Sequence, residues 1–304
     1  MRFLLFGGNG QVGWELRRAL APLGEVIAPP REGADGLCGD IAAFDGLADT
    51  VRRARPDVIV NAASWTDVDG AEREPERARR LNAEAPGVLA RCAAGIGAWL
   101  VHYSSDYVFD GSGERPWRET DAPAPLNVYG QTKLAGEDAI RAAGGPHLIL
   151  RTGWVYAARR DNFLRTILRL AAERDTLRVI DDQIGAPTGA DLIADVSARL
   201  LGPQRPDSRL AGTYHLTATG AVSWHGYARL IVATAQAHGW RLRLTPAAVE
   251  PVSTEAYGQR VPRPRNSRLD CARLERVSGL RMPAWEDGVV RGIRGLRGVV
   301  GQTR

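Results

Sequence analysis

The sequence predicts an α/β fold with a doubly wound parallel sheet and a smaller C-terminal domain. Short apolar runs alternate with longer helical patterns as far as residue 151. The apolar runs are nearly uninterrupted, which is typical of strands covered on both faces. Repeated strand–helix–strand units form right-handed crossovers, and these place parallel strands in one sheet with helices on both sides.

The elements of the first half follow from these patterns. Uninterrupted apolar runs predict strands at Arg2–Phe6, Glu25–Ala28, Asp57–Asn61, Trp99–Tyr103 and His147–Arg151. Apolar residues three and four positions apart predict helices at Val12–Ala21, Phe44–Arg53, Glu76–Ala94 and Leu126–Ala142.

The second half is less regular, which favours a smaller domain with some segments that return to the sheet. Helical spacing predicts helices at Phe163–Glu173, Asp191–Leu201, Trp224–His238, Asp270–Val277 and Glu286–Leu296. A short strand is expected at Tyr214–Leu216, and the proline-rich stretch Pro246–Pro264 is expected to be a loop. The predicted domains are residues 1–151 and 152–304.

Composition excludes several classes of protein. Of the 304 residues, 44% are hydrophobic and 25% are charged, which excludes a mainly disordered chain. Its apolar runs are too short to span a membrane, so a cytoplasmic protein is expected. The three cysteines form no CxxC pair, and the histidines show no metal-ligand spacing. Although the net charge is +5, the arginines are scattered among acids, and no nucleic-acid partner is expected.

A glycine-rich turn directly follows the first predicted strand and opens the first helix. The segment reads Gly7-Gly8-Asn9-Gly10-Gln11-Val12-Gly13. Glycines allow a tight turn and the close approach of a pyrophosphate, whose charge is favourable at a helix N-terminus. The turn therefore predicts a dinucleotide site, and the alternative is a purely structural strand-to-helix turn.

Three further segments are candidates for contact with that cofactor. Arg31 follows the second strand, where an arginine can meet the 2′-phosphate of NADP; a plain surface arginine is the alternative. Asp40-Ile41 precedes the second helix, where it can contact an adenine, although Asp40 alternatively caps that helix. Ala62-Ala63-Ser64 ends the third strand with small residues against which a flat cofactor can lie.

The most specific local pattern pairs Tyr129 with Lys133, the only lysine of the chain. Residues four apart share one helix face, and an ammonium group favours the ionised form of a nearby phenol. This chain uses arginine wherever a general positive charge suffices, so a compact ammonium is expected to be required at position 133. Ser105, after the fourth strand, supplies a third hydroxyl group. An incidental pair on a surface helix is the alternative.

Other catalytic patterns are missing from the sequence. Lys133 follows Thr132, so it does not belong to a P-loop, whose lysine follows a glycine. Neither HExxH nor G-x-S-x-G occurs, which argues against a zinc protease and a serine hydrolase.

With these motifs in place, the chain resembles the extended short-chain dehydrogenase/reductases and, within them, the reductases of dTDP-4-keto-6-deoxy sugars. The resemblance runs nearly from end to end. The motifs that carry it are Gly10–Leu16, Cys38–Asp40, Val60–Ala63, Val68-Asp69, Tyr103–Phe109, Pro125–Gly130, Arg151–Tyr156, Asp182–Thr188 and Arg263–Leu269.

The resemblance implies roles for individual residues. Tyr129 would be the proton donor, and Lys133 would bind the cofactor ribose and tune the tyrosine. Ser105 stands where the family usually has threonine, and it would hold the reacting oxygen. Trp154 would face the sugar together with Ser105 and Asp106, and Val68-Asp69 would lie at the substrate. Trp65 occupies a position beside the cofactor where the family has histidine.

The resemblance also implies the reaction and its partners. NADPH, with NADH as a further possibility, would reduce the C4 keto group of dTDP-4-dehydro-6-deoxy-L-mannose to give dTDP-L-rhamnose. A sister nucleotide-sugar reductase or epimerase, and a non-catalytic nucleotide-binding regulatory subunit, are the alternatives. Some members dimerise through Mg²⁺ held by acids. Glu15 and Asp191 match two of these acids, but Gly295 stands in the place of the third, so the resemblance does not decide whether this chain binds Mg²⁺. The chain is expected to be a monomer or homodimer.

Overall fold

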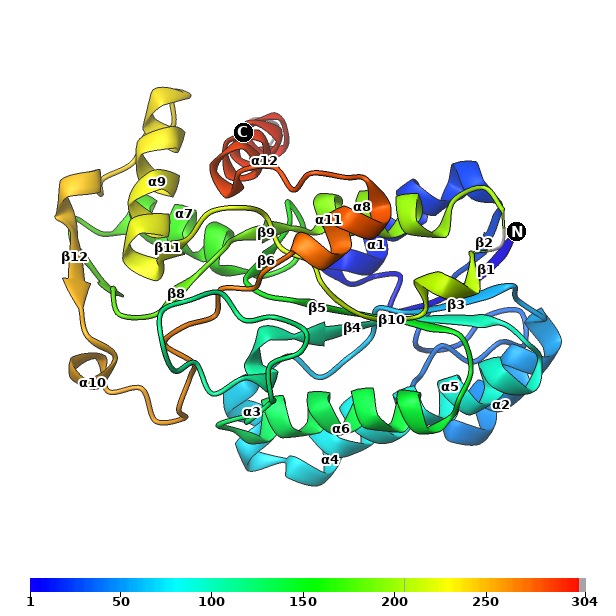
Figure 1. The fold of residues 1–304 in the computed structure, drawn as a ribbon. Helices are drawn as coiled ribbons and strands as arrows, with labels where there is room; N and C mark the ends of the chain where they lie inside the picture. The colour runs from blue at the N-terminus through cyan, green and yellow to red at the C-terminus, as the bar shows by residue number, and fades with distance from the viewer. Residues whose placement is uncertain (205, 301–304) are drawn as a thin grey trace.

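A six-stranded parallel sheet forms the centre of the computed structural model, which describes residues 1–204 and 206–300 (Figure 1). The strand order is β10-β5-β4-β3-β1-β2. Since β2 and β3 lie on opposite sides of β1, the order reverses there, and open α/β sheets bind ligands beside such a reversal. The six strands are β1 (Arg2–Phe6), β2 (Glu25–Ile27), β3 (Val58–Asn61), β4 (Trp99–Ser105), β5 (His147–Thr152) and β10 (Gly212–His215).

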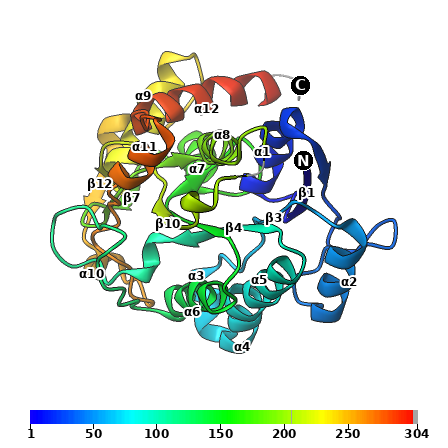
Figure 2. The ribbon, with the colours of Figure 1, turned by 45° about the vertical axis from the view of Figure 1, so that its right-hand side comes forward.

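Helices cover both faces of this sheet, as the predicted doubly wound fold requires (Figure 2). On one face lie α2 (Phe44–Ala54), α5 (Ala85–Gly95) and α6 (Val128–Ala142). On the other lie α1 (Gln11–Leu20), α8 (Ala190–Leu201) and α11 (Ala272–Ser278). Strand β1 shows why: Phe3 and Leu5 belong to the core with α1 and α8, whereas Leu4 and Phe6 belong to the opposite core.

The segment predicted as one helix over Glu76–Ala94 is interrupted in the structure. It comprises α4 (Pro75–Arg79), a π-helical turn at Arg80–Glu84, and α5, and it follows α3 (Val68–Arg73). The π turn presents Asn82, which is buried and bonded to the backbone of Trp65 and to the Thr132 hydroxyl group. This polar contact joins the segment after β3 to helix α6.

The second half builds its own core beside the sheet. Helices α7 (Phe163–Glu173), α9 (Trp224–Ala237) and α12 (Trp285–Val300) surround it, together with the parallel pair β7 (Leu177–Ile180) and β12 (Val249–Val252). Short pairs join β6 (Val155–Tyr156) to β9 (Thr188–Gly189) and β8 (Ile184–Gly185) to β11 (Val222–Ser223). The 3₁₀ turns are Ala21–Leu23, Asp106–Val108, Ser208–Leu210 and Pro246–Ala248.

The prediction that Pro246–Pro264 is only a loop is wrong. This stretch contains β12 and the short helix α10 (Thr254–Tyr257). Pro251 lies within β12, where it is tolerated because the strand has a single partner and needs hydrogen bonds on one side only. Parallel pairing with the distant β7 stabilises the strand, and local sequence does not reveal such pairing.

The second half also contributes to the main sheet. Strand β10 pairs with β5, and α8 packs against α1. The division of the chain into two domains at residue 151 stays a prediction. Among the residues that the structure describes, no helix is long and apolar enough to cross a membrane.

A buried ion pair fixes helix α6 to strand β5. The Arg151 guanidinium donates to both carboxylate oxygens of Glu137, at 2.8 and 2.7 Å, and both side chains are almost inaccessible to solvent. The Ser104 hydroxyl group on β4 donates to the same carboxylate at 2.6 Å. Burial raises the pKa of Glu137, but the bonds and charge of Arg151 outweigh it, so the pKa is lowered overall and the pair is ionised at neutral pH.

We predict that Glu137→Gln lowers the free energy of unfolding at pH 7 by about 3–5 kcal/mol, because it leaves the buried Arg151 charge without a counter-ion. Urea unfolding measures the change. Glu173→Gln on α7 is the matched control, since its pair with Arg169 is exposed and contributes about 0–1 kcal/mol. Equal effects of the two substitutions would contradict the prediction.

Candidate active site

The glycine-rich turn has the shape of a phosphate cradle. Gly7 has a φ of +79°, and a β-carbon there would lie 2.7 Å from the carbonyl carbon of Ala62. A β-carbon at Gly13 would lie 2.0 Å from the Gly7 oxygen. Helix α1 then begins at Gln11 without a side-chain cap and without an acid in its first turn. Its first backbone N–H groups, at Gln11 and Val12 among others, therefore fit an anion.

The end of β3 lies directly against this turn. The Ala62 N–H group donates to the Phe6 carbonyl oxygen at 3.0 Å, and the Ala63 N–H group donates to the Asn61 side chain at 3.2 Å. Ala62, Ala63 and Ser64 are half-buried. The topology thus brings together two segments that the sequence separates by about fifty residues.

Arg31 and Asp40, both predicted to contact the cofactor, lie near each other. The Arg31 Nε atom is 3.7 Å from the Asp40 carboxylate, so this arginine has an acidic neighbour that the sequence did not place there. Asp40 accepts the Ala42 N–H group at 3.1 Å but does not cap α2, whose N-cap residue is Ala43. The Ile41 side chain packs in the core, which leaves its backbone for any contact with a ligand.

Lys133 is buried beneath the carboxyl end of β4. Its side chain is 1% exposed, and its Nζ atom donates to the Tyr103 carbonyl oxygen at 2.6 Å. Nζ also lies 3.3 Å from Nε2 of His102. Burial lowers the pKa of Lys133 to about 8. A surface helix with an incidental Tyr/Lys pair does not have this geometry.

His102 and Asn61 complete the surroundings of Lys133, and the sequence reasoning missed both. Asn61 Nδ2 lies 3.2 Å from Nδ1 of His102, and both side chains are buried. Burial and the Lys133 charge lower the pKa of His102 far below its usual range, so its imidazole is neutral at pH 7. The signal available was a histidine inside an otherwise apolar strand.

Tyr129 lies one helical turn before Lys133 and holds its proton in the free protein. Burial raises the pKa of its phenol to about 12, although the hydrogen bond to Ser105 opposes the rise. The Lys133 ammonium bonds to the Tyr103 carbonyl oxygen and is not among the groups that set the pKa of Tyr129 here, so its role in tuning the tyrosine stays a prediction. A protonated phenol is the form that a proton donor requires.

Ser105 and Asp106 stand beside Tyr129. The Ser105 hydroxyl group donates to Oδ1 of Asp106 at 2.9 Å and accepts the Tyr107 N–H group at 3.1 Å. Burial raises the pKa of Asp106 to about 6. Its Oδ2 atom is buried and makes no hydrogen bond of regular geometry within the described part of the chain, although the Ser267 hydroxyl group lies close enough to Asp106 to lower its pKa. A buried oxygen of this kind fits the hydroxyl group of a ligand.

Trp154 adopts an unusual backbone conformation at the carboxyl end of β5, with a φ of +50°. Its indole stacks on Trp224 with ring centroids 3.5 Å apart, and a β-carbon at Gly185 would lie 2.5 Å from its Cε2 atom. Trp154 is half-buried. The expectation that it packs on a sugar rather than in the core needs a correction, because one face also supports the second core.

Val68-Asp69 begins α3 near this region. Asp69 pairs with Arg263 at 2.9 Å, which links α3 to the late motif Arg263–Leu269. Trp65 lies just before this helix, and its indole N–H group donates to the Asp67 carbonyl oxygen at 2.7 Å. The sequence reasoning did not single out Arg263, although its motif was recognised.

The acids that would hold a bridging Mg²⁺ have arginine partners. Glu15 pairs with Arg18 at 3.1 Å, and Asp191 pairs with Arg291 at 2.8 Å. The described part of the chain contains no group of three His, Cys, Asp or Glu side chains that fits a metal ion. A Mg²⁺ ion between two copies of the chain would have to compete with these arginines for the two carboxylates.

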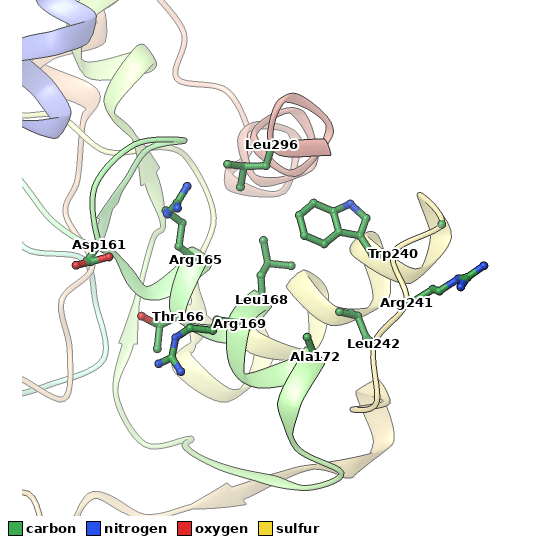
Figure 3. Close-up of a pocket in the computed structure, with 11 residues that line it drawn as sticks. Asp161, Arg165, Thr166, Leu168, Arg169, Ala172, Trp240, Arg241, Leu242 and Leu296 are labelled. Carbon is green, nitrogen blue, oxygen red and sulfur yellow. The ribbon is translucent and has the colours of Figure 1, made fainter. Parts of the chain in front are cut away.

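Two hollows lie outside this cluster of side chains. One, of about 550 Å³, is bordered by α7, the segment after α9, and Leu296 of α12 (Figure 3). The other, of about 730 Å³, is bordered by residues 119–123 and the outer part of α6. None of their lining residues is among the predicted site residues.

Comparison with known proteins then decides the family. The family described as RmlD substrate binding domain matches residues 1–297. The chain belongs to this family. Its relatives include dTDP-4-dehydrorhamnose reductases of Shigella flexneri, 51% identical over 96% of both chains, and of Burkholderia thailandensis, 44% identical over 97% of this chain and 99% of the relative.

Solved structures of RmlD relatives have the same fold. The dTDP-4-dehydrorhamnose reductase of Bacillus anthracis, in complex with NADP, superposes with a TM-score of 0.87 at 34% identity, covering 97% of this chain and 99% of that one. The UDP-glucose 4-epimerase of Thermus thermophilus has a TM-score of 0.78 at 19% identity, covering 98% and 99%, which shows a shared fold only. The predicted family and the predicted Rossmann-like fold are confirmed.

We predict that Asp106→Asn stabilises the protein at pH 8. A carboxyl group whose pKa rises from 3.8 to about 6 on folding costs its ionised form about 3 kcal/mol. This cost is complete above pH 6, shrinks as the folded protein takes up the proton, and disappears below the unfolded pKa of 3.8. The asparagine variant should therefore gain up to about 3 kcal/mol at pH 8 and clearly less at pH 5.

Urea unfolding at both pH values tests this prediction. Asp49→Asn is the matched control, because Asp49 is exposed and pairs with Arg52 at the surface. An asparagine variant that is less stable than wild type at pH 8 would show that the ionised carboxylate stabilises the site.

Proposed function

We propose that this chain uses NADPH to reduce the 4-keto group of dTDP-4-dehydro-6-deoxy-L-mannose, also called dTDP-4-dehydrorhamnose, to dTDP-L-rhamnose. The observation that carries the proposal is the cluster of Tyr129, Ser105 and Lys133 beneath the carboxyl end of β4. The family relationship supports it, since close relatives are named dTDP-4-dehydrorhamnose reductase.

The residues present fit a dinucleotide. The pyrophosphate would bind at the glycine-rich turn, because a side chain at Gly7 or Gly13 would clash there and the N-terminus of α1 has no side-chain cap. The residues of this subsite are Gly7, Gly10, Gln11, Val12 and Gly13. Other contacts would follow the edge of the sheet, from the adenine half to the nicotinamide half of the cofactor. These residues are Arg31, Asp40, Ile41, Ala62, Ala63, Ser64, Tyr129 and Lys133.

NADPH, when bound, supplies the hydride that reduces C4 of the sugar. Tyr129 donates a proton from its phenol to the C4 oxygen as negative charge develops there. Ser105 holds that oxygen by its hydroxyl group. In the free protein this hydroxyl donates to Asp106, so its proton must turn toward the substrate, or Asp106 must be protonated.

Lys133 acts through its fixed position. Its bond to the Tyr103 carbonyl oxygen uses one of the three ammonium protons, which leaves the others for ribose hydroxyl groups. Charge at this buried point stabilises the phenolate that remains on Tyr129 after proton transfer. Neutral His102 lies beside Lys133 without adding a competing positive charge.

The sugar would lie between β5 and α3. The buried Oδ2 of Asp106 would accept a sugar hydroxyl group, and Trp154 would contact the ring with the part of its indole that Trp224 and Gly185 leave uncovered. Val68 and Asp69 would border the same space from the start of α3. The backing of Trp154 by Trp224 fixes the indole, so little side-chain entropy is lost when a sugar binds.

A panel of nucleotide sugars tests this proposal. NADPH oxidation should be fast with dTDP-4-dehydrorhamnose, and mass spectrometry and NMR should identify dTDP-L-rhamnose as the product. Preference for another keto sugar would indicate a sister reductase. A chain that binds the nucleotide without turnover, and that co-purifies with a second enzyme, would indicate a regulatory subunit.

We further propose a cytoplasmic protein that acts without a nucleic-acid partner, as a monomer or a homodimer. A substrate built on a soluble nucleotide supports this, as does the dispersal of arginines among acidic partners over the surface. Sedimentation velocity at several protein concentrations distinguishes monomer from dimer.

We predict that Lys133→Arg lowers turnover at least about tenfold, equivalent to roughly 1.4 kcal/mol of transition-state stabilisation. The longer guanidinium cannot occupy the buried point beside Tyr103 and His102 without displacing a neighbour. Tyr129→Phe should cost more, because it removes the proton donor while NADPH still binds. Steady-state kinetics and cofactor titration measure both, and the double variant should be little worse than Tyr129→Phe.

Near wild-type turnover of Lys133→Arg would mean that a general positive charge suffices at position 133. Retained turnover of Tyr129→Phe would remove the tyrosine from the mechanism.

We predict that Arg31→Ala weakens NADPH binding but leaves NADH binding nearly unchanged, because only NADPH carries the 2′-phosphate. The ratio of the affinity for NADPH to the affinity for NADH, measured by calorimetry, should fall severalfold. Asp40, at 3.7 Å from Arg31, limits the effect, since part of the arginine charge is already neutralised. Equal losses for both cofactors would contradict the assignment.

A further inference from the structure

A segment of the second half crosses the glycine-rich turn. Residues 157–162 join β6 to α7, and we call them the crossing segment. The Arg160 Nε atom donates to the Asn9 carbonyl oxygen at 3.0 Å, and Asn162 Nδ2 donates to the Gln11 side chain at 2.9 Å. Asn9 and Gln11 flank Gly10, the N-cap residue of α1. The segment therefore lies against the same turn that fits a pyrophosphate.

Two arginines of this segment have no acidic partner among the described residues. Arg159 and Arg160 are exposed, and neither forms an ion pair with a described residue. The Arg159 guanidinium lies 3.6 Å from the ring centroid of Trp14, in the first turns of α1. The N-terminus of a helix carries a partial positive charge, and the first turn of α1 contains no acid. Two guanidinium groups at a positive helix end are unfavourable unless an anion binds between them.

The backbone of the segment is strained yet firmly held. Arg160 has a φ of +64°, in the left-handed region that side chains other than glycine rarely adopt. Asn162 Nδ2, which also bonds to Gln11, donates to the Ala157 carbonyl oxygen at 2.8 Å, and Arg165 donates to the Ala158 carbonyl oxygen at 2.7 Å. Strain that is retained in this way is common at functional sites.

We propose that Arg160 binds the pyrophosphate of the dinucleotide cofactor, so that the second half of the chain completes the cofactor site. This proposal rests on the proposed function, which supplies the dinucleotide. The pyrophosphate is common to NADPH and NADH, so Arg160 acts equally on both cofactors. Arg31, by contrast, would recognise only the 2′-phosphate.

Arg160→Gly separates binding from stability. Glycine suits the left-handed backbone, so the variant should unfold at the same temperature as wild type or higher, while the guanidinium is lost. Calorimetry at low ionic strength should show the dissociation constants of NADPH and NADH rising by about tenfold each. The affinity for 2′-AMP, which lacks the pyrophosphate, should not change. Arg169→Ala, which removes an exposed arginine of α7, is the matched control and should bind all three ligands like wild type.

The affinity for dTDP distinguishes the two pyrophosphates of the reaction. It should be unchanged in Arg160→Gly, because Arg160 contacts the glycine turn, where the cofactor is expected. The proposal would be overturned if Arg160→Gly bound only NADPH more weakly, or if it bound dTDP or 2′-AMP more weakly. Dissociation constants of NADPH and NADH within twofold of wild type would also overturn it. If wild type binds neither dinucleotide, the proposed function fails as well, whereas normal wild-type binding with an unaffected variant overturns only the role of Arg160.

Discussion

The buried pair of Glu137 and Arg151 is the interaction on which the reactive geometry depends. It joins α6 to the end of β5, and the Ser104 hydroxyl group adds β4 to the same carboxylate. Tyr129 and Lys133 precede Glu137 on one helix, at intervals of four residues that keep all three on one face. A bidentate buried ion pair is costly to bury but costlier to break, so it fixes the position of the helix more sharply than apolar packing alone.

This placement gives the polar groups of the site their separate properties. Burial keeps the Tyr129 phenol protonated, brings the pKa of Lys133 down to about 8 and raises that of Asp106 to about 6. A proton donor, a cation and a buried acceptor therefore lie together at the carboxyl end of β4. Environments that push neighbouring pKa values apart are typical of sites that transfer protons.

Much of this arrangement could be predicted from the sequence. The rest depends on contacts between distant segments, which local sequence patterns do not reveal. Strand β1 has the predicted bounds because its apolar run ends at the glycine-rich turn, and helix α7 has them because its helical periodicity starts directly after the N-cap residue Asn162. Strand β12 was missed because its stability comes from the distant β7. Tyr129 and Lys133 were found by spacing, whereas His102 and Trp224 contribute only through three-dimensional contacts. The proximity of Asp40 to Arg31 likewise could not be predicted, because it depends on how the segment between them folds.

Transfer of a deuterium label tests the central claim most directly. Wild-type enzyme, dTDP-4-dehydrorhamnose and NADPH deuterated at the transferred position of the nicotinamide should give dTDP-L-rhamnose with deuterium at C4 alone. Tyr129→Phe should bind the same cofactor but transfer little label. Deuterium at another carbon, its loss to solvent, or undiminished transfer by Tyr129→Phe would contradict a reduction at C4 in which Tyr129 supplies the proton.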